Sequence, residues 1–331
     1  MSENAPLDPL AVLIVTGPDP ALRSDLIDAL GTTIREPGQE LAIVAGDAET
    51  LDADLERVLA MEEAALAVID LTEGDDPALV LDAVEPLVED EAAVLLGVLA
   101  ALDAARFWAD FREGPSALAR SLVSAIESAS LVVLANGAEA SAAELRALEG
   151  LVRNLNPAAA VLGLEAVANL ALPELAQVIA ETEGGADGGT AIAEAGADED
   201  DGPLAGESDA WGFNSFTWST ETRLDRGRFM ALFENWPVEV LRAHGVARFD
   251  DGATAVLSVV RDTVAIDEYG GDEDGQGHDD HHHDHDHEAE LAGDEDVALG
   301  EDESEIAFVG IDMPVAALVG WLDACQVDDE A

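Results

Sequence analysis

The sequence predicts an α/β protein, with a mostly parallel sheet flanked by helices and a smaller α+β domain after it. Two observations predict this class. In the first half of the chain, short apolar runs alternate with segments of helical periodicity, which is typical of parallel strands joined by helices. A stretch rich in Gly, Ala and acidic residues then interrupts the pattern, and a second group of strand and helix patterns follows it.

The first domain is expected to span residues 1–181. Its first apolar run, Leu10–Thr16, predicts a strand, turn residues follow, and the periodicity of Ala21–Leu30 predicts a helix. Further strands are predicted, with helix-compatible segments between most of them, at Leu41–Ala45, Leu66–Leu71, Val94–Leu99, Leu131–Ala135 and Ala159–Gly163.

The second domain is expected at residues 211–327, after an acidic Gly/Ala linker at 182–210. Strand patterns occur at Phe213–Ser219, Ala255–Ile266 and Glu305–Gly310, and helical patterns at Asp225–Trp236 and Pro314–Cys325, with Asp225 as the expected N-cap. Between the last two strand patterns the chain becomes polar and highly charged. We expect this insertion, residues 267–304, to be disordered.

The charge balance is extreme, with 72 acidic residues against 14 basic ones, all of them Arg, and a formal net charge of −58. Molar salt shortens the Debye length to about 3 Å and makes such an acid excess tolerable, so the composition predicts a salt-accumulating halophile. Nucleic acid is excluded as a partner by the sign of the charge. The longest apolar run, Ala92–Leu102, is too short to cross a bilayer about 30 Å thick, and Met1–Leu10 has no basic targeting region, so we expect a cytoplasmic protein without membrane partners.

The turn after the first strand has the position of a phosphate-binding loop. Gly17 and Ser24 fit the spacing of G-x-x-x-x-G-K-[ST], but Arg23 replaces the lysine, and the prolines at 18 and 20 remove two amide donors that a phosphate would need. Two interpretations remain open. Gly17, Arg23 and Ser24 could still bind a nucleotide weakly, or the turn is retained only for folding, which we favour because several elements are altered together.

Several further segments occur in the order of a known family. They are Asp70-Leu71-Thr72-Glu73-Gly74-Asp75-Asp76-Pro77, the helix that ends in Leu155-Asn156-Pro157, and then Ser215-Phe216-Thr217, Val240-Leu241-Arg242-Ala243-His244-Gly245 and Phe308-Val309-Gly310. In this order and spacing they resemble the CobW family, the P-loop GTPase metallochaperones that deliver zinc, cobalt or other metals.

The resemblance implies a P-loop-NTPase-like first domain, a CobW C-terminal domain, and GTP with Mg²⁺ as ligands. Asp70 takes the place of the glutamate in the family's E-x-x-G-x-x-D-P segment and completes the candidate nucleotide-binding set of Gly17, Arg23, Ser24 and Asp70. The guanine-reading N-K-x-D motif falls at 135–138 or 136–139 and lacks its lysine and aspartate in both registers. The family's C-x-C-C metal motif is absent, since Cys325 is the single cysteine.

Six of the seven histidines lie together, alternating with aspartates, in the His/Asp tract that we define as residues 278–288. The candidate metal ligands are His278, His281, His282, His283, His285 and His287. Imidazole is a favoured ligand of transition metals, and His-rich tracts bind them by composition, so we favour a site for Zn²⁺, or for cobalt or nickel, over an inert polar loop. The seventh histidine, His244, is expected to be a structural or surface residue.

These observations lead to one main hypothesis and two alternatives. The main one is a CobW-like protein that buffers zinc or a related metal, or presents it to a client metalloprotein or to an intact CobW-family GTPase, while its own GTP site is impaired. The alternatives are an active but divergent GTP-binding metallochaperone, and a pseudo-GTPase that pairs with an intact paralogue. No residue is assigned a catalytic role.

Overall fold

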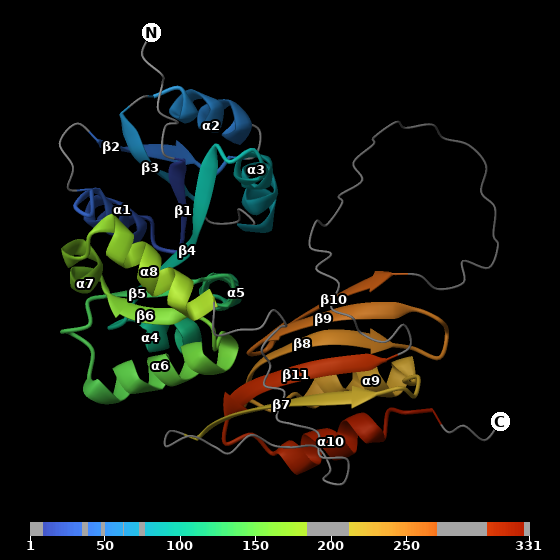
Figure 1. Ribbon diagram of the computed structural model, residues 1–331. Coiled ribbons are helices and arrows are strands. Elements are labelled where there is room, and N and C mark those ends of the chain that lie inside the picture. The colour runs from blue at the N-terminus through green and yellow to red at the C-terminus, as the bar shows by residue number, and fades with distance from the viewer. Residues whose placement is uncertain are drawn as a thin grey trace, which may run out of the picture. The chain divides into compact units, whose positions relative to one another are not determined.

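The computed structural model describes residues 9–34, 39–47, 50–61, 63–72, 77–183, 212–269 and 303–327. The chain divides into two compact units, Met1–Ala191 and Ile192–Ala331, and the division falls within the expected linker. Each unit has its own sheet, which confirms the predicted class (Figure 1). We refer to the units as the N-terminal and C-terminal domains.

The N-terminal domain is built on a six-stranded sheet in the order β2-β3-β1-β4-β5-β6, in which every described strand pair is parallel. The strands are β1 Leu10–Thr16, β2 Glu40–Ala45, β3 Ala64–Asp70, β4 Ala93–Asp103, β5 Leu131–Ala135 and β6 Ala160–Gly163. The helices are α1 Pro20–Gly31, α2 Leu51–Leu59, α3 Pro77–Glu89, α4 Phe107–Glu113, α5 Ser116–Glu127, α6 Ala142–Leu155, α7 Leu164–Asn169 and α8 Leu172–Glu183.

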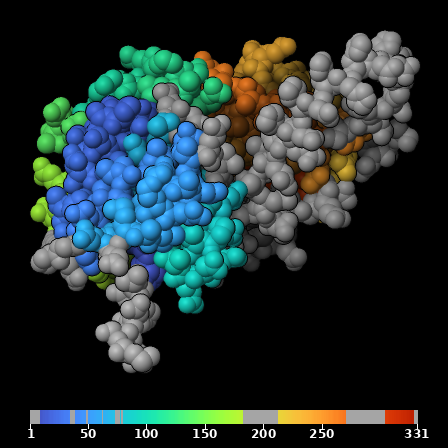
Figure 2. Space-filling view, turned by 90° about the horizontal axis from the view of Figure 1, so that it is seen from above, coloured from blue at the N-terminus to red at the C-terminus, as the bar shows by residue number. Residues whose placement is uncertain are grey.

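The central strand β1 shows why these apolar runs form a covered parallel sheet. Leu13 and Val15 pack into a core with α1, α7 and α8, while Val12 and Ile14 pack on the opposite face with α2 and α3. A strand buried on both faces needs an unbroken apolar run, which is the pattern that predicted it. Figure 2 shows α2 and α3 side by side on the surface of this domain.

The C-terminal domain contains an antiparallel five-stranded sheet in the order β10-β9-β8-β11-β7. Its strands are β7 Phe213–Thr220, β8 Val240–Arg248, β9 Thr254–Val260, β10 Thr263–Tyr269 and β11 Ser304–Ile311. Its helices are α9 Arg226–Leu232, the 3-10 turn η1 Phe233–Asn235 and α10 Val315–Asp323. Phe216, Phe308 and Leu318 belong to the core between the sheet and these helices.

The structure confirms most predicted elements and corrects the boundaries of others. The expected N-cap of α9 is present, since the Asp225 carboxylate accepts the backbone N–H of Arg228 at 2.7 Å. The central strand β8 was missed, because its Arg, His and Gly residues hide the apolar alternation. β10 continues to Tyr269, three residues into the expected insertion, because its polar end pairs with β9 as an edge strand.

The strand order reverses between β1 and β4, and this reversal fixes where a ligand site would lie. From β1 the chain continues towards the β2 edge of the sheet, whereas from β4 it continues towards the β6 edge. β1 is flanked by β3 on one side and by β4 on the other (Figure 1). In open α/β sheets, ligands bind outside the carboxyl ends of the strands at the point where the order reverses. The turns that follow β1 and β4 therefore frame the expected position. In the described parts of the chain, no helix is long and apolar enough to cross a membrane.

Candidate functional site

The turn between β1 and α1 is short. β1 ends at Thr16 and α1 begins at Pro20, so only three residues separate them. Asp19 is the N-cap, and its carboxylate accepts the backbone N–H of Ala21 at 2.9 Å. A phosphate-binding loop needs free backbone N–H groups at this place, and here one of them is already bonded to a carboxylate while Pro18 and Pro20 have none.

Gly17 has a packing role that explains its presence without a nucleotide. Its φ of +139° lies in a region that favours glycine. A Cβ atom at this position would lie 2.5 Å from the backbone oxygen of Ala101 on β4. The turn therefore passes so close to the neighbouring strand that only glycine fits.

Arg23, which stands where a phosphate-binding lysine would be, is turned into the protein. Its side chain is only 4% exposed; Nε donates to Asp70 Oδ1 at 2.7 Å, and Nη1 donates to the Gly17 carbonyl at 2.7 Å. The structure thus brings together three of the four candidate nucleotide-binding residues in one internal contact. Ser24, the fourth, lies on the exposed surface of α1.

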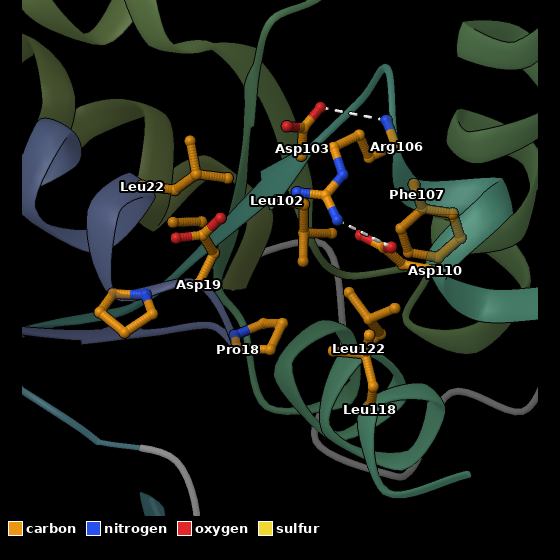
Figure 3. A pocket seen from close by; sticks show the side chains of 12 residues that line it. Pro18, Asp19, Leu22, Leu102, Asp103, Arg106, Phe107, Asp110, Leu118 and Leu122 are labelled. Carbon is orange, nitrogen blue, oxygen red and sulfur yellow. Dashed lines mark hydrogen bonds and ion pairs between the residues drawn. The ribbon is translucent and has the colours of Figure 1, made fainter. Parts of the chain in front are cut away.

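A hollow of about 330 Å³ opens at the ends of β1 and β4 (Figure 3). We call it the switch-point pocket. Its lining combines apolar side chains with three carboxylates and one guanidinium, and comprises Pro18, Asp19, Pro20, Leu22, Ala101, Leu102, Asp103, Arg106, Phe107, Asp110, Leu118 and Leu122. The sequence patterns did not point to Asp103, Arg106 or Asp110, although an aspartate at the end of a buried strand was a usable signal.

Two of the polar residues that line the pocket, Asp103 and Arg106, are held by hydrogen bonds and an ion pair within the domain. Asp103 Oδ1 accepts the backbone N–H groups of Ala105 and Arg106, and Oδ2 accepts Nδ2 of Asn136 at 2.9 Å. Arg106 pairs with Asp110 across one helical turn, at 3.2 Å. Asn136, the residue retained from the N-K-x-D position, therefore fixes the end of β4.

The Asn-Pro segment after α6 has a structural role. Nδ2 of Asn156 donates to the carbonyl oxygens of Ile126, Glu127 and Ala129, at 2.9, 3.1 and 2.8 Å. The carbonyls of Ile126 and Glu127 lie at the end of α5, where a helix has no donors of its own, and that of Ala129 lies two residues beyond it. Asn156 thus closes α5 from a distant part of the sequence.

The His/Asp tract, with all six candidate ligands from His278 to His287, lies outside the described residues, as do 73–76 of the segment after Asp70. Within the described parts of the chain, no group of three or more His, Cys, Asp or Glu side chains could hold a metal ion. His244 lies on β8, half-buried, opposite Ala307 and Ser258. Its place in the middle of the sheet agrees with the expected structural role.

Cys325 is not available as a thiolate ligand. It is buried, and desolvation raises the pKa of its thiol from the ordinary value of 9.0 to about 11, while the neighbouring Arg228 lowers it by less. Its Sγ donates to the carbonyl oxygen of Trp321 at 3.2 Å. A neutral, enclosed thiol binds metals poorly, because the thiolate is the ligand.

The strands on either side of the insertion are anchored by arginines. Arg226 on α9 pairs with Asp251 at 2.9 Å and also with Glu268 at the end of β10. Arg248 Nε donates to the carbonyl of Glu303, just before β11. β9 and β8 separate β10 from β11, so the two ends of the insertion lie about 14 Å apart, at one end of the sheet.

Comparison with known proteins identifies the domain that carries these anchors. Residues 213–326 match the family model described as the cobalamin synthesis protein cobW C-terminal domain. This part of the chain is a CobW C-terminal domain. The match covers roughly a third of the chain and confirms, for this domain, the resemblance stated from the sequence. It also shows that the insertion, tract included, lies inside the matched range.

No curated protein matches the chain. Among solved structures, the Zn(II)-bound YjiA GTPase from E. coli is similar over 96% of this chain and 99% of its own, with 15% identity and a TM-score of 0.40. A Zn(II)-bound triple mutant of YjiA GTPase is equally similar, with 15% identity, coverage of 96% of this chain and 99% of its own, and a TM-score of 0.40. Both likenesses are distant.

Replacing Arg23 with alanine is expected to lower the free energy of unfolding by about 2–3 kcal/mol, because it removes hydrogen bonds from a charged donor to Asp70 and Gly17. Denaturation by urea in molar KCl measures the change. Arg57→Ala is the matched control, since that side chain is 72% exposed and pairs with Asp54 within α2. The control should change stability by less than about 0.5 kcal/mol. Equal losses in the two variants would contradict the structural role of Arg23.

The Cys325 thiol is expected to react with iodoacetamide at pH 8 far more slowly in the native protein than in urea. Its raised pKa also makes stability depend on pH. The unfolded thiol ionises from about pH 9 while the folded thiol keeps its proton, so this contribution is complete below pH 9 and is lost as the pH rises towards 11. Rapid labelling of the native protein would show that the thiol is accessible.

Proposed function

We propose that this protein handles zinc or a related transition metal, binding it through the six histidines of the His/Asp tract, and that it does not hydrolyse GTP efficiently. The metal would be buffered, or passed to a client metalloprotein or to an intact CobW-family GTPase. One observation carries the proposal: the tract lies within the range 213–326 that matches the CobW C-terminal domain. A cytoplasmic location, expected from the sequence, remains a prediction.

The anchoring of the insertion supports a separate metal-binding segment. β10 pairs with β9, and β11 pairs with β7 and β8. The strand pairs of the sheet therefore need none of the residues between β10 and β11. Arg226 and Arg248 hold the two strand ends in place. A metal could therefore bind and leave the tract while the sheet stays as it is.

The contacts around Arg23 support the proposal that the GTP site is impaired. The guanidinium is already bonded to Asp70 and Gly17, and the start of α1 already carries the Asp19 carboxylate. A nucleotide would have to displace Arg23 and bring phosphate close to Asp19 and Asp103. Both steps oppose binding.

Replacing all six tract histidines with asparagine is expected to abolish tight zinc binding, because asparagine keeps the polarity and length of the chain but removes the imidazole ligands. Isothermal titration of the full chain in molar KCl measures the binding. Zinc affinity of the unchanged protein should also fall between pH 7.5 and 5.5, since protons compete for imidazole.

Two controls sharpen this titration. His244→Asn removes the one histidine outside the tract and should leave zinc binding unchanged. Deletion of 278–288 should act like the six substitutions, and the residues that remain on both sides are long enough to span about 14 Å. Zinc binding that is equal in the deleted and complete proteins would refute the proposal.

Neither GTP nor ATP with Mg²⁺ is expected to bind detectably in molar KCl, with or without zinc, because Pro18 and Pro20 have no N–H, the N–H of Ala21 is bonded to Asp19, and Arg23 is bonded to Asp70 and Gly17. Calorimetry on the complete protein tests this. Binding that is lost in Ser24→Ala, an exposed substitution on α1, would instead favour the divergent GTPase.

A further inference from the structure

None of the residues that line the switch-point pocket belongs to the His/Asp tract, and the pocket occupies the position where an open α/β sheet binds ligands. It lies entirely within the N-terminal domain. Its floor is the end of β4, one wall is the β1–α1 turn, and the other walls come from α4 and α5 (Figure 3). The chemistry of these walls decides which ligand the pocket accepts.

An anion is a poor match for this pocket. The turn beside it offers no amide donor at Pro18 or Pro20, and the N–H of Ala21 is bonded to Asp19. Arg23 points away from it, into its contact with Asp70 and Gly17. The lining carries three carboxylates and a single guanidinium, which leaves an excess of negative charge.

The three carboxylates differ in how many of their oxygens are still able to accept a hydrogen bond from a ligand. Both oxygens of Asp103 are bonded to groups of the protein. Asp110 uses one oxygen for Arg106, whose guanidinium lies beside it in Figure 3. Asp19 uses one oxygen for Ala21, and no cationic side chain pairs with it among the described residues. One oxygen of Asp19 and one of Asp110 thus remain for a ligand.

The rest of the lining is apolar. Leu22, Leu118 and Leu122 face the pocket from α1 and α5, and Phe107 faces it from α4. Arg106 is an example of a cation in this setting, because its guanidinium pairs with Asp110 at the rim of the apolar hollow. A ligand with one positive charge and a small apolar body would meet both kinds of surface.

We propose that the switch-point pocket binds a small organic cation, an alkylammonium or alkylguanidinium group, with its charge beside Asp19 and Asp110 and its alkyl part against the leucines. This inference is independent of metal binding by the tract.

The test uses the full-length protein in molar KCl with n-butylguanidinium and n-butylammonium as probes, and calorimetry as the measurement. Uncharged n-butanol and anionic butyrate match the probes in their apolar part. The cations should bind at millimolar concentration or below, at least tenfold more tightly than butanol, and butyrate should not bind. A higher KCl concentration should weaken the binding of the two cations and leave the binding of butanol unchanged.

Asp19→Asn is the sharpest variant, because asparagine is as good an N-cap as aspartate and only the charge is lost. It should weaken binding of the cations at least fivefold. Asp110→Asn should do the same without touching the cap, and Asp25→Asn, the same change on the exposed surface of α1, should alter affinity less than twofold. Unchanged affinity in both Asp19→Asn and Asp110→Asn, equal binding of butanol, or no binding of either cation would overturn the proposal.

Discussion

The contact between Arg23 and Asp70 fixes the geometry on which the N-terminal domain's ligand position depends. It joins the first turn of α1 to the end of β3 and, through the Gly17 carbonyl, to the end of β1. A buried guanidinium needs such partners, since an unpaired charge in the interior costs several kcal/mol. The guanidinium of Arg23 is thus part of the fold, and three carboxylates and one guanidinium line the neighbouring pocket.

Arginine is scarce in this chain, and several arginines hold distant segments together. Arg226 connects α9 to the β8–β9 turn and to the end of β10, and Arg248 connects β8 to the residue before β11. In a chain of net charge −58, each such contact also relieves repulsion locally. Because the planar guanidinium donates in several directions, one side chain can bridge two acidic segments where a lysine would offer a single point charge.

The proposed functions use the two domains differently. Metal binding is assigned to an insertion that leaves the C-terminal sheet intact, so ligand chemistry there is set by composition and needs little from the fold. Cation binding in the N-terminal domain is assigned to a preformed pocket, whose charges are set by helix caps and strand ends. The first site could evolve by substitutions in the tract alone, whereas the second depends on the packing of β1 and β4.

The sequence by itself determined the parallel α/β class, the strands Leu10–Thr16 and Leu131–Ala135, the N-cap at Asp225 and the CobW-like C-terminal domain, because these follow from local periodicity and motif order. It could not reveal β8, whose alternation is hidden, or the extension of β10, which depends on pairing with β9. Only the tertiary structure decided that Arg23 faces Asp70 and that Asp19, Asp103 and Asp110 line one pocket. Those contacts join residues far apart in the chain, and their geometry is set by the packing of whole strands and helices.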